Sequence, residues 1–469
     1  MTFIGRRDEL SFLQSCYTSK KAQLAVVYGR RRVGKTELLS HFAKDKECVF
    51  FAAPSATKEE QLAAFSRQMF AAGAPASKYL RQYADWESAL ADIVNLPVKS
   101  GKRKLVIIDE FPYLVRADNS LPSIIQNLWD HSLKNENVML VLCGSAMSFI
   151  EKDVLSEKSP LYGRATGILK VLPMPYWDAA DFFPNYTAAD KALSYAVLGG
   201  IPHYLAEFDP DESLENNIKQ HVLRRGSALY SEVEFLMHQE FREPATYNAI
   251  LQAVALGATR LNDIAQRTML QSQAVSAYLK NLIEVNIIER EFPVDAKPVE
   301  ESKSMRGLYR LSDNFFRFWF AFVAFNRSAL EMGDIDGVYQ YEIAAKLHDF
   351  AAMPFERICA DWVRLQNTKR NLPFYANAIG RWWDAKSEID VIATSKTGEC
   401  VLAGECKFRS KPVEASVLRD LKEKALRIKG SKKNYILFSL SGYSAELAKL
   451  TDEDETLRLV SVEELYSVE

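Results

Sequence analysis

The stretch Gly29-Arg-Arg-Arg-Val-Gly-Lys-Thr36 decides the fold expected for the first part of this chain. An apolar run at residues 24–28 precedes it and predicts a buried strand, and residues 37–44 follow with a helical pattern. Strand, Gly-x-x-x-x-Gly-Lys-Thr and helix, in this order, predict a loop that binds phosphates. The two glycines let backbone N–H groups turn inward, and the helix directs the positive end of its dipole at the phosphates.

The remaining residues of this loop have separate chemical tasks. We expect Lys35 to reach the β- and γ-phosphates as a compact charge and the Thr36 hydroxyl to coordinate Mg²⁺. The sequence therefore predicts a site for a nucleoside triphosphate and its Mg²⁺ ion. The residues expected to contact the nucleotide here are Gly29, Arg30, Arg31, Arg32, Val33, Gly34, Lys35, Thr36 and Glu37.

A second apolar run, residues 104–108, ends in Asp109 and Glu110. Its continuous apolar character is typical of a central parallel strand. We expect Asp109 to hold the Mg²⁺ shell and Glu110 to orient and polarise the attacking water as a general base. The loop and this acid-ended strand together predict that the nucleotide is hydrolysed.

Two more polar residues lie beside predicted strands. Ser145 follows the run at 138–143 and is either a sensor of the γ-phosphate or an N-cap for the next helix. Arg164 precedes the strand expected at 168–172 and is either an arginine finger or an ordinary surface arginine. A finger acts within its own chain or on a neighbouring copy, and the second case requires a homo-oligomer.

The order of these motifs resembles a known family. The chain is similar to the archaeal-type ATPases found in archaea and bacteria, which belong to the AAA+/STAND group of P-loop NTPases. The resemblance covers the first half of the chain and implies ATP as the nucleotide. It also implies that Gly5 and Arg6 lie by the nucleotide base, and that Gly200 and Pro202 lie in a helical lid. The matching segments are Phe3-Ile-Gly-Arg6, Gly29 to Thr36, Asp109-Glu110, Gly144-Ser145, Gly163-Arg164 and Gly199-Gly-Ile-Pro202.

The middle of the chain predicts a winged helix. Residues 259–267 and 272–283 have helical patterns separated by a turn, and two short strands follow. In a DNA-binding winged helix the second helix enters the major groove by its first residues. A packing module is the alternative, because acidic residues lie nearby. The expected DNA contacts are Gln271, Ser272, Gln273, Ser276 and Lys280 on the helix, and Lys297, Lys303 and Arg306 on the wing.

The last part of the chain carries a second chemical pattern. A strand at 388–393 contains Asp390, and the strand returning from a tight turn contains Glu405 and Lys407. Residues two apart on a strand point to the same face. This is the PD-(D/E)xK arrangement of nucleases, in which Asp390 and Glu405, with Glu356 on the preceding helix, would bind Mg²⁺ or Mn²⁺. Lys407 would stabilise the attacking hydroxide or the developing phosphorane charge.

This block also resembles the restriction-endonuclease-like domain of unknown function that accompanies archaeal-type ATPases. A basic segment after the hairpin suits a phosphate backbone, although a solvated helix face would look the same. The fold expected for the whole chain is α/β. The expected domains are a P-loop NTPase core with a parallel sheet at 1–175, a helical lid at 176–240, a winged helix at 241–313, linking helices at 314–345 with a buried aromatic helix, and the nuclease-like domain at 346–469.

Bulk properties limit the function further. The chain has 469 residues, a net charge of −2 and six scattered cysteines, which fits a reducing cytoplasm and gives no disulfide framework. No run is apolar enough for a membrane span. We therefore predict a cytoplasmic ATPase that couples its nucleotide state to a nuclease-like domain acting on DNA. The alternatives are a regulator whose last domain only binds, and a DNA-loading protein that reads DNA with its winged helix.

Overall fold

The P-loop motif lies in a five-stranded sheet with the order β2-β3-β4-β1-β5, in which every pairing is parallel. The carboxyl ends of parallel strands meet at one edge, and Gly29, Glu110 and Ser145 follow three of these ends directly. The predicted strands are therefore confirmed as one sheet. Their bounds are β1 Gln23–Tyr28, β2 Cys48–Ala52, β3 Lys104–Asp109, β4 Val138–Gly144 and β5 Gly167–Lys170.

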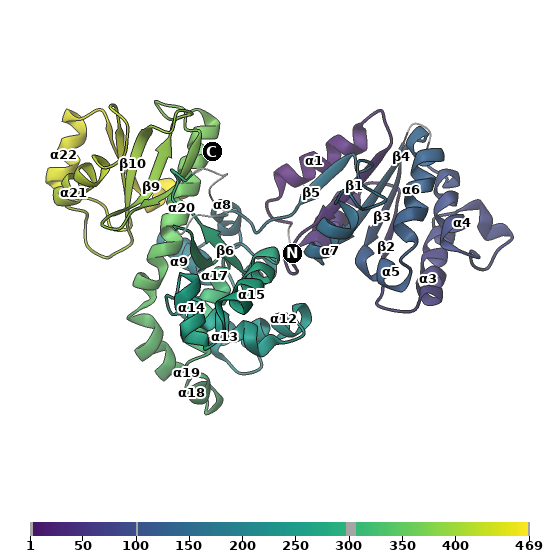
Figure 1. The fold of residues 1–469 in the computed structure, drawn as a ribbon, viewed down its shortest axis with the longest axis horizontal. Helices are drawn as coiled ribbons and strands as arrows, with labels where there is room; N and C mark the ends of the chain where they lie inside the picture. Colours follow the sequence, from purple (N-terminus) through teal and green to yellow (C-terminus); the bar gives the residue numbers. More distant parts are fainter. Residues whose placement is uncertain (1–2, 100–101, 297–305, 468–469) are drawn as a thin grey trace. The chain divides into compact units, whose positions relative to one another are not determined.

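Both faces of this sheet are covered by helices (Figure 1). Alternate residues of β1, such as Leu24 and Val26, pack with Phe65 of α3 and Trp86 of α4 in one core cluster. Strands β1 and β4 are buried along their whole length, which explains their almost continuous apolar sequences, whereas β2 and β5 are partly exposed. The helices are α1 Arg7–Thr18, α2 Lys35–Ala43, α3 Lys58–Ala71, α4 Trp86–Ala91, α5 Phe111–Ala117, α6 Leu121–His131 and α7 Met147–Phe149.

The computed structural model describes residues 3–99, 102–296 and 306–467. The chain forms two compact units, of which the first contains residues 1–174 and 201–203 and the second contains 175–200 and 204–469. The expected wing residues Lys297 and Lys303 lie outside the described residues. In the described parts, no helix has both the length and the apolar character needed to cross a bilayer.

Helices dominate residues 176–240, as the pattern predicts. Within the second unit, α9 packs against α17 and α20, and Asn314 Nδ2 of α17 donates a hydrogen bond of 2.8 Å to the Tyr195 carbonyl of α9. Much of the expected lid is thus part of the second unit. The bounds are α8 Tyr176–Ala180, α9 Ala188–Leu198, α10 Pro202–Leu205, α11 Leu214–Asn217 with a π-helical turn Ile218–Leu223, and α12 Glu232–Glu240.

One helix that was not predicted follows, and then two helices and an antiparallel strand pair in the element order predicted for the winged helix. Val275, Leu279 and Leu282 form the buried stripe of α15. Asp313 caps the aromatic helix, because its side chain accepts a hydrogen bond from the Phe316 N–H. The bounds are α13 Pro244–Ala255, α14 Leu261–Thr268, α15 Ser272–Glu284, β6 Ile288–Glu291, β7 Leu308–Leu311, α17 Asn314–Phe318 with a π-helical turn Trp319–Val323, α18 Arg327–Glu331, and α19 Ile335–Gly337 with a π-helical turn Val338–Ala344.

The last part of the chain builds a separate mixed sheet with the order β12-β11-β10-β9-β8. The pairs β8–β9 and β9–β10 are antiparallel, and β10–β11 and β11–β12 are parallel. The helix that carries Glu356 and the hairpin with Asp390, Glu405 and Lys407 follow one another as the pattern predicts. The bounds are α20 Leu347–Lys369, β8 Ala378–Trp383, β9 Glu388–Thr394, β10 Cys400–Lys407, α21 Ala415–Ala425, β11 Asn434–Ser439, α22 Ala445–Glu453, β12 Leu457–Ser461 and α23 Val462–Tyr466.

Candidate functional site

The loop between β1 and α2 is shaped around its two glycines. A Cβ atom on Gly29 would lie 2.4 Å from the Val171 carbonyl oxygen, so any larger residue would push the loop away from the sheet. Gly34 has a φ of 85°, in the left-handed region that glycine adopts without strain. Both glycines of the motif are therefore required by backbone geometry.

Lys35 lies in the buried part of this loop. Its side chain is 6% exposed, and Nζ donates a hydrogen bond of 3.0 Å to the Arg30 carbonyl. Burial lowers the pKa of Lys35, while the carboxylates of Glu110 and Asp109 act to raise it. The ammonium group thus lies near the two acids at the end of β3, with the loop folded around it.

The predicted Mg²⁺ ligands lie side by side. Thr36 Oγ1 donates a hydrogen bond of 2.6 Å to Asp109 Oδ2, although they are far apart in sequence. Asp109 Oδ1 accepts a hydrogen bond of 2.9 Å from the Glu110 N–H, which orients the carboxylate. A hydroxyl and a carboxylate are the hard oxygen donors that Mg²⁺ prefers, so the residues present fit this ion.

Ser145 faces Glu110. Its hydroxyl lies 3.0 Å from each carboxylate oxygen of Glu110, within hydrogen-bonding distance of both. The next helix, α7, has Ala146 as its N-cap and no side-chain cap, so the N-cap interpretation of Ser145 is wrong. Glu110 itself has a φ of 53°, a left-handed conformation that turns its side chain at the strand end. The expected general base and the expected sensor therefore form one polar pair.

Arg6 supports the loop from the side. Its guanidinium donates hydrogen bonds of 2.8 Å to the Val33 carbonyl and 2.7 Å to the Leu172 carbonyl, and it forms an ion pair with Glu9. The side chain is 4% exposed. Arg6 thus connects the start of α1 with the phosphate-binding loop and with the residues that follow β5.

We expect Arg6→Gln to weaken ATP binding and to destabilise the first unit. A hydrogen bond from a charged group contributes about 1.5–3 kcal/mol, and glutamine cannot reach both carbonyls. The KM for ATP and the urea midpoint of unfolding would measure the two effects. Arg7→Gln is the matched control because Arg7 is exposed. Equal values for the two variants would contradict the supporting role of Arg6.

Arg164 has a partner of its own. Its Nε and Nη2 donate hydrogen bonds of 3.0 and 2.7 Å to Asp130 Oδ2 of α6, and Nη1 donates to the Pro160 and Tyr162 carbonyls. The guanidinium is thus held in its own chain by a bidentate pair. The arginine-finger assignment stays a prediction that would require this pair to open.

The other expected nucleotide contacts are distributed over both units. Pro202 lies beside the loop, because a Cβ on Gly34 would be 3.6 Å from Pro202 Cγ. Gly5 has a φ of 63°, and Gly200 is buried in the second unit. Of the rest, Arg30 and Val33 are buried, Arg31 is half-buried, and Arg32 and Glu37 are exposed.

Comparisons with known proteins agree with this geometry. A family described as an ATPase domain predominantly from Archaea matches residues 3–208, and a family described as archaeal and bacterial proteins of unknown function matches residues 319–423. An uncharacterized protein of Methanocaldococcus jannaschii is 34% identical over 409 residues, which cover 87% of this chain and 88% of that protein. The chain belongs to the archaeal-type ATPase family. It is an ATPase whose nucleotide is ATP.

Two further similarities support this assignment. An uncharacterized ATP-binding protein of Methanocaldococcus jannaschii is 47% identical over 45 residues, which cover 10% of this chain and 76% of that protein. The structure of a Walker-type ATPase of Pyrococcus abyssi is similar in fold, with a TM-score of 0.51 and 20% identity. That match covers 68% of this chain and 96% of the other.

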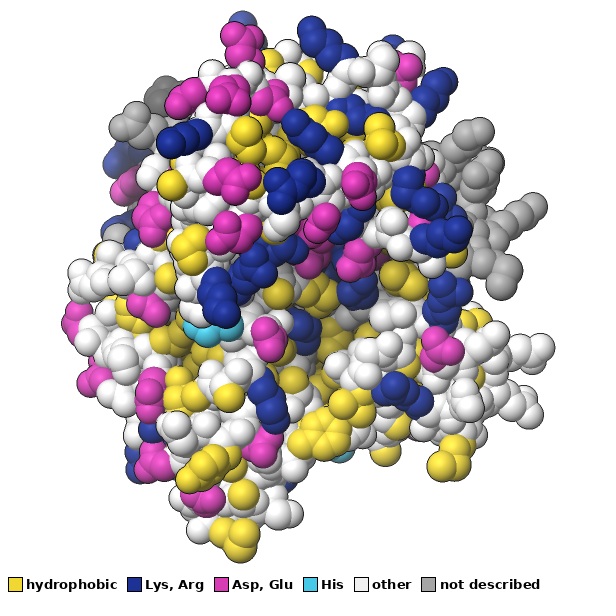
Figure 2. All heavy atoms as spheres, turned by 90° about the vertical axis from the view of Figure 1, so that its left-hand side faces the viewer, with side chains coloured by type: hydrophobic (Ala, Val, Ile, Leu, Met, Phe, Trp, Pro, Cys, Tyr) yellow, Lys and Arg dark blue, Asp and Glu magenta, His cyan; other side chains and the backbone are white. Residues whose placement is uncertain are grey.

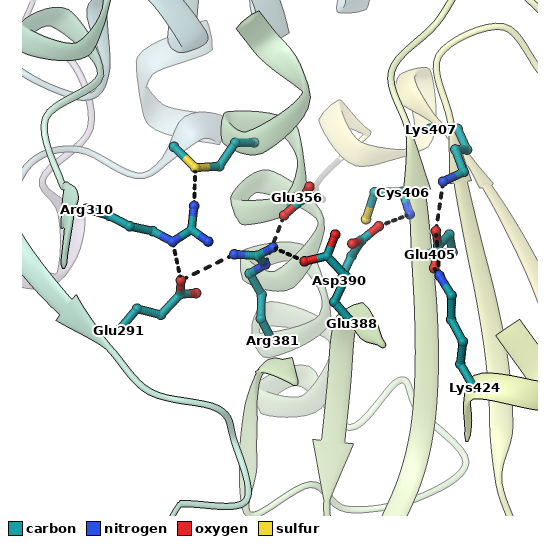
Figure 3. Close-up of polar contacts among 11 residues, drawn as sticks. Glu291, Arg310, Glu356, Arg381, Glu388, Asp390, Glu405, Cys406, Lys407 and Lys424 are labelled. Atoms are coloured by element: carbon teal, nitrogen blue, oxygen red, sulfur yellow. Dashed lines mark hydrogen bonds and ion pairs between the residues drawn. The ribbon is translucent and has the colours of Figure 1, made fainter. Parts of the chain in front are cut away.

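A second polar cluster lies in the C-terminal sheet of this ATPase (Figure 3). The register of β9 and β10 pairs Val391 with Gly404, which places Asp390 next to Glu405. Asp390 Oδ2 accepts a hydrogen bond of 2.9 Å from the Cys406 N–H. Burial and the charge of Glu405 raise the pKa of Asp390, and burial and the charge of Asp390 raise the pKa of Glu356. The charge of Asp390 therefore interacts with that of Glu405 and with that of Glu356.

Two carboxylates of this cluster, those of Glu405 and Glu356, each face positively charged side chains of the chain. Lys407 Nζ lies 2.7 Å from Glu405 Oε1, and Lys424 Nζ of α21 lies 3.4 Å from Glu405 Oε2. Glu356 Oε2 lies 3.0 Å from Arg381 Nε of β8. Among the described residues, no three His, Cys, Asp or Glu side chains converge as a metal site. The carboxylate oxygens of Glu405 and Glu356 are suitable ligands for Mg²⁺ or Mn²⁺. In this arrangement they contact lysine and arginine side chains instead.

Sequence reasoning did not find Lys424 and Arg381. Both contact the expected nuclease residues, but they lie on other elements, α21 and β8. Lys424 belongs to a run of basic residues that looks like a solvated face, and Arg381 lies between Gly380 and Trp382 without any motif. Only the pairing of β8 with β9 brings Arg381 to the cluster.

The predicted DNA contacts have different surroundings. On α15, the expected positions 271–273, 276 and 280 are all exposed, as a recognition helix requires. Arg306 instead donates a hydrogen bond of 2.8 Å to the Trp383 carbonyl and lies 3.1 Å from Asp295 Oδ1. On and after α21, four basic side chains form ion pairs with acids of the chain: Arg419 with Glu446, Lys422 with Asp454, Lys424 with Glu405 and Arg427 with Asp384.

Proposed function

We propose that this ATPase is a nucleotide-driven switch whose second unit acts on DNA. The pair of contacts Thr36–Asp109 and Ser145–Glu110 supports hydrolysis as the driving step. In this proposal Lys35 holds the β- and γ-phosphates, Glu110 takes a proton from the attacking water, and Ser145 orients Glu110. Mg²⁺, when bound at Thr36 and Asp109, supplies the charge that neutralises the phosphates.

One observation about the chain supports the proposed coupling between the two units. Residues 201–203 belong to the first unit, whereas the chain on both sides of them belongs to the second. Pro202 is a neighbour of Gly34, because a Cβ atom placed on Gly34 would lie 3.6 Å from Pro202 Cγ. A movement of the phosphate-binding loop would therefore be passed to the second unit through the backbone itself, at a point next to the bound phosphates.

The face of the molecule in Figure 2 supports local DNA contacts and not one broad basic field. Figure 2 shows Lys and Arg side chains interspersed with Asp and Glu on the face that it presents. The net charge of −2 agrees with this mixture. Binding would depend on the exposed polar start of α15, where no acidic side chain lies among residues 271–280.

Cleavage of DNA by the C-terminal domain is the first candidate activity, and binding without cleavage is the second. The side-by-side placement of Asp390, Glu405 and Lys407 favours cleavage. The second lysine on Glu405, Lys424, favours the binding-only regulator, because both carboxylate oxygens then have cationic partners. Both candidates use the same ATP-driven switch.

We expect Lys407→Ala to abolish cleavage of plasmid or linear DNA in Mg²⁺ or Mn²⁺ and to leave DNA affinity within about twofold, because one phosphate contact contributes little to affinity at moderate salt. Gel assays of cleavage and fluorescence anisotropy of binding would measure both. Lys411→Ala is the control, because Lys411 is exposed on the loop after β10. If the unmodified protein binds DNA and never cleaves it, with or without ATP, the regulator is the correct assignment.

A further inference from the structure

Arg381 occupies an unusual position in the C-terminal domain. It lies in β8 where the register with β9 shifts between Gly380 and Trp382, an irregularity that redirects a side chain. The side chain is 14% exposed, and each of its three nitrogens faces a different carboxylate (Figure 3). The distances are 3.0 Å from Nε to Glu356, 3.3 Å from Nη1 to Glu291 and 3.3 Å from Nη2 to Glu388.

Arg381 therefore links two parts of the second unit. Glu356 belongs to the predicted nuclease cluster, whereas Glu291 ends strand β6 of the β6–β7 hairpin. Glu291 is also held by Arg310 of β7, whose Nε lies 2.7 Å from the same carboxylate oxygen. The backbone agrees, because the Val294 N–H donates a hydrogen bond of 2.8 Å to the Arg381 carbonyl. The hairpin and the carboxylate cluster thus share one guanidinium.

Of the three contacts that Arg381 makes with carboxylates, the one with Glu356 is the incomplete one. Arg381 Nε and Glu356 Oε2 are both buried and lie 3.0 Å apart, but they do not form an aligned hydrogen bond. A misaligned ion pair is weaker than a bidentate one and is easier to displace. A guanidinium stays charged under all ordinary conditions. Arg381 therefore offsets the negative charge of Glu356 for as long as the two side chains are in contact.

We propose that Arg381 is an internal cation that holds Glu356 in place of a divalent metal ion, and that Glu291 and Arg310 of the hairpin keep it in that position. The inference rests on the proposed assignment of Glu356, Asp390 and Glu405 as metal ligands. It makes the cluster a latent site, in which Mg²⁺ or Mn²⁺ competes with Arg381 for Glu356. A partner that moves the hairpin would release Arg381 and open the site to metal.

Isothermal titration of the full-length chain with Mn²⁺, without nucleotide, tests this inference. We expect Arg381→Gln to bind Mn²⁺ at least about tenfold more tightly than the unmodified protein, the size of effect typical of residues that support metal ligands. The gain should disappear in Arg381→Gln with Asp390→Asn, because the metal needs that carboxylate. Arg419→Gln is the control, since Arg419 is an exposed arginine paired with Glu446 on another helix.

A second variant covers the case in which Arg381→Gln does not fold. Arg310→Gln removes the other cation from Glu291, so Arg381 should move toward Glu291 and release Glu356. We expect a smaller gain in Mn²⁺ affinity of the same sign, whereas general loosening of the domain would lower the affinity.

The possible failures are distinguishable. If the unmodified protein binds Mn²⁺ through Asp390 and neither arginine variant binds more tightly, the role of Arg381 is wrong and the metal assignment stands. If no variant binds Mn²⁺ at Asp390, the metal assignment itself is wrong, and the inference is wrong with it.

Discussion

Lys35→Ala is expected to lower the rate of ATP hydrolysis by about 10²–10³-fold, the usual cost of removing a positioned donor from developing charge. Lys35 is buried in the phosphate-binding loop, close to Asp109 and Glu110, and no other lysine side chain lies within residues 29–37. Alanine leaves the phosphates without their point charge. Release of inorganic phosphate at saturating ATP would measure the rate, and titration with a fluorescent ATP analogue would measure binding.

Lys44→Ala is the matched control for this substitution. Lys44 follows the end of α2, which begins at Lys35, and its side chain is exposed. The control should hydrolyse ATP at the rate of the unmodified protein. Normal hydrolysis by Lys35→Ala would show that the loop is not the hydrolytic site.

Glu110→Gln should separate binding from hydrolysis. Glutamine keeps the shape of the side chain but cannot take a proton from water, and loss of a general base costs about 10²–10⁴-fold in rate. ATP affinity should change little, because glutamine keeps the size of the side chain and the contact of Thr36 with Asp109 does not use the Glu110 carboxylate. Single-turnover hydrolysis and equilibrium binding of ATP would give the two values.

Two further substitutions make the Glu110 experiment specific. Glu87→Gln on α4 changes an exposed glutamate in the same unit and should have no effect. Ser145→Ala should lower the rate less than Glu110→Gln does, since Ser145 acts through Glu110. A variant with Glu110→Gln that hydrolyses ATP normally would exclude Glu110 as the base and move that role to another group near Asp109.

The central strands β1, β3 and β4 of the first unit could be predicted because they are buried along almost their whole length. The predicted and observed bounds of β1, β3 and β4 differ by one residue or less. The predicted and observed bounds also agree to within one residue for the C-terminal hairpin, where a tight turn restricts the register. The local pattern of apolar residues is sufficient to predict the bounds of a strand when residues adjacent in sequence determine both the strand and its burial.

The partners of single polar side chains could not be predicted in the same way. The sequence allows two roles for Ser145, a sensor of the γ-phosphate or an N-cap. Only the placement of β4 beside β3 brings its hydroxyl to Glu110. Arg6 is expected near the nucleotide base, and no motif predicts that its guanidinium donates hydrogen bonds to the Val33 and Leu172 carbonyls. Arg164 is held by Asp130 of α6, a contact that no motif contains.

The sequence by itself determined the phosphate-binding loop, the acid-ended strand after it and the pairing of Asp390 with Glu405, because each depends on spacing within one or two adjacent elements. Tertiary structure alone decided which charges neutralise one another. Arg381, Glu291 and Glu356 come from a strand, a hairpin and a helix far apart in the chain. An ion pair depends on distance in space, and that distance is set only when the sheet order and the packing of its helices bring these elements together.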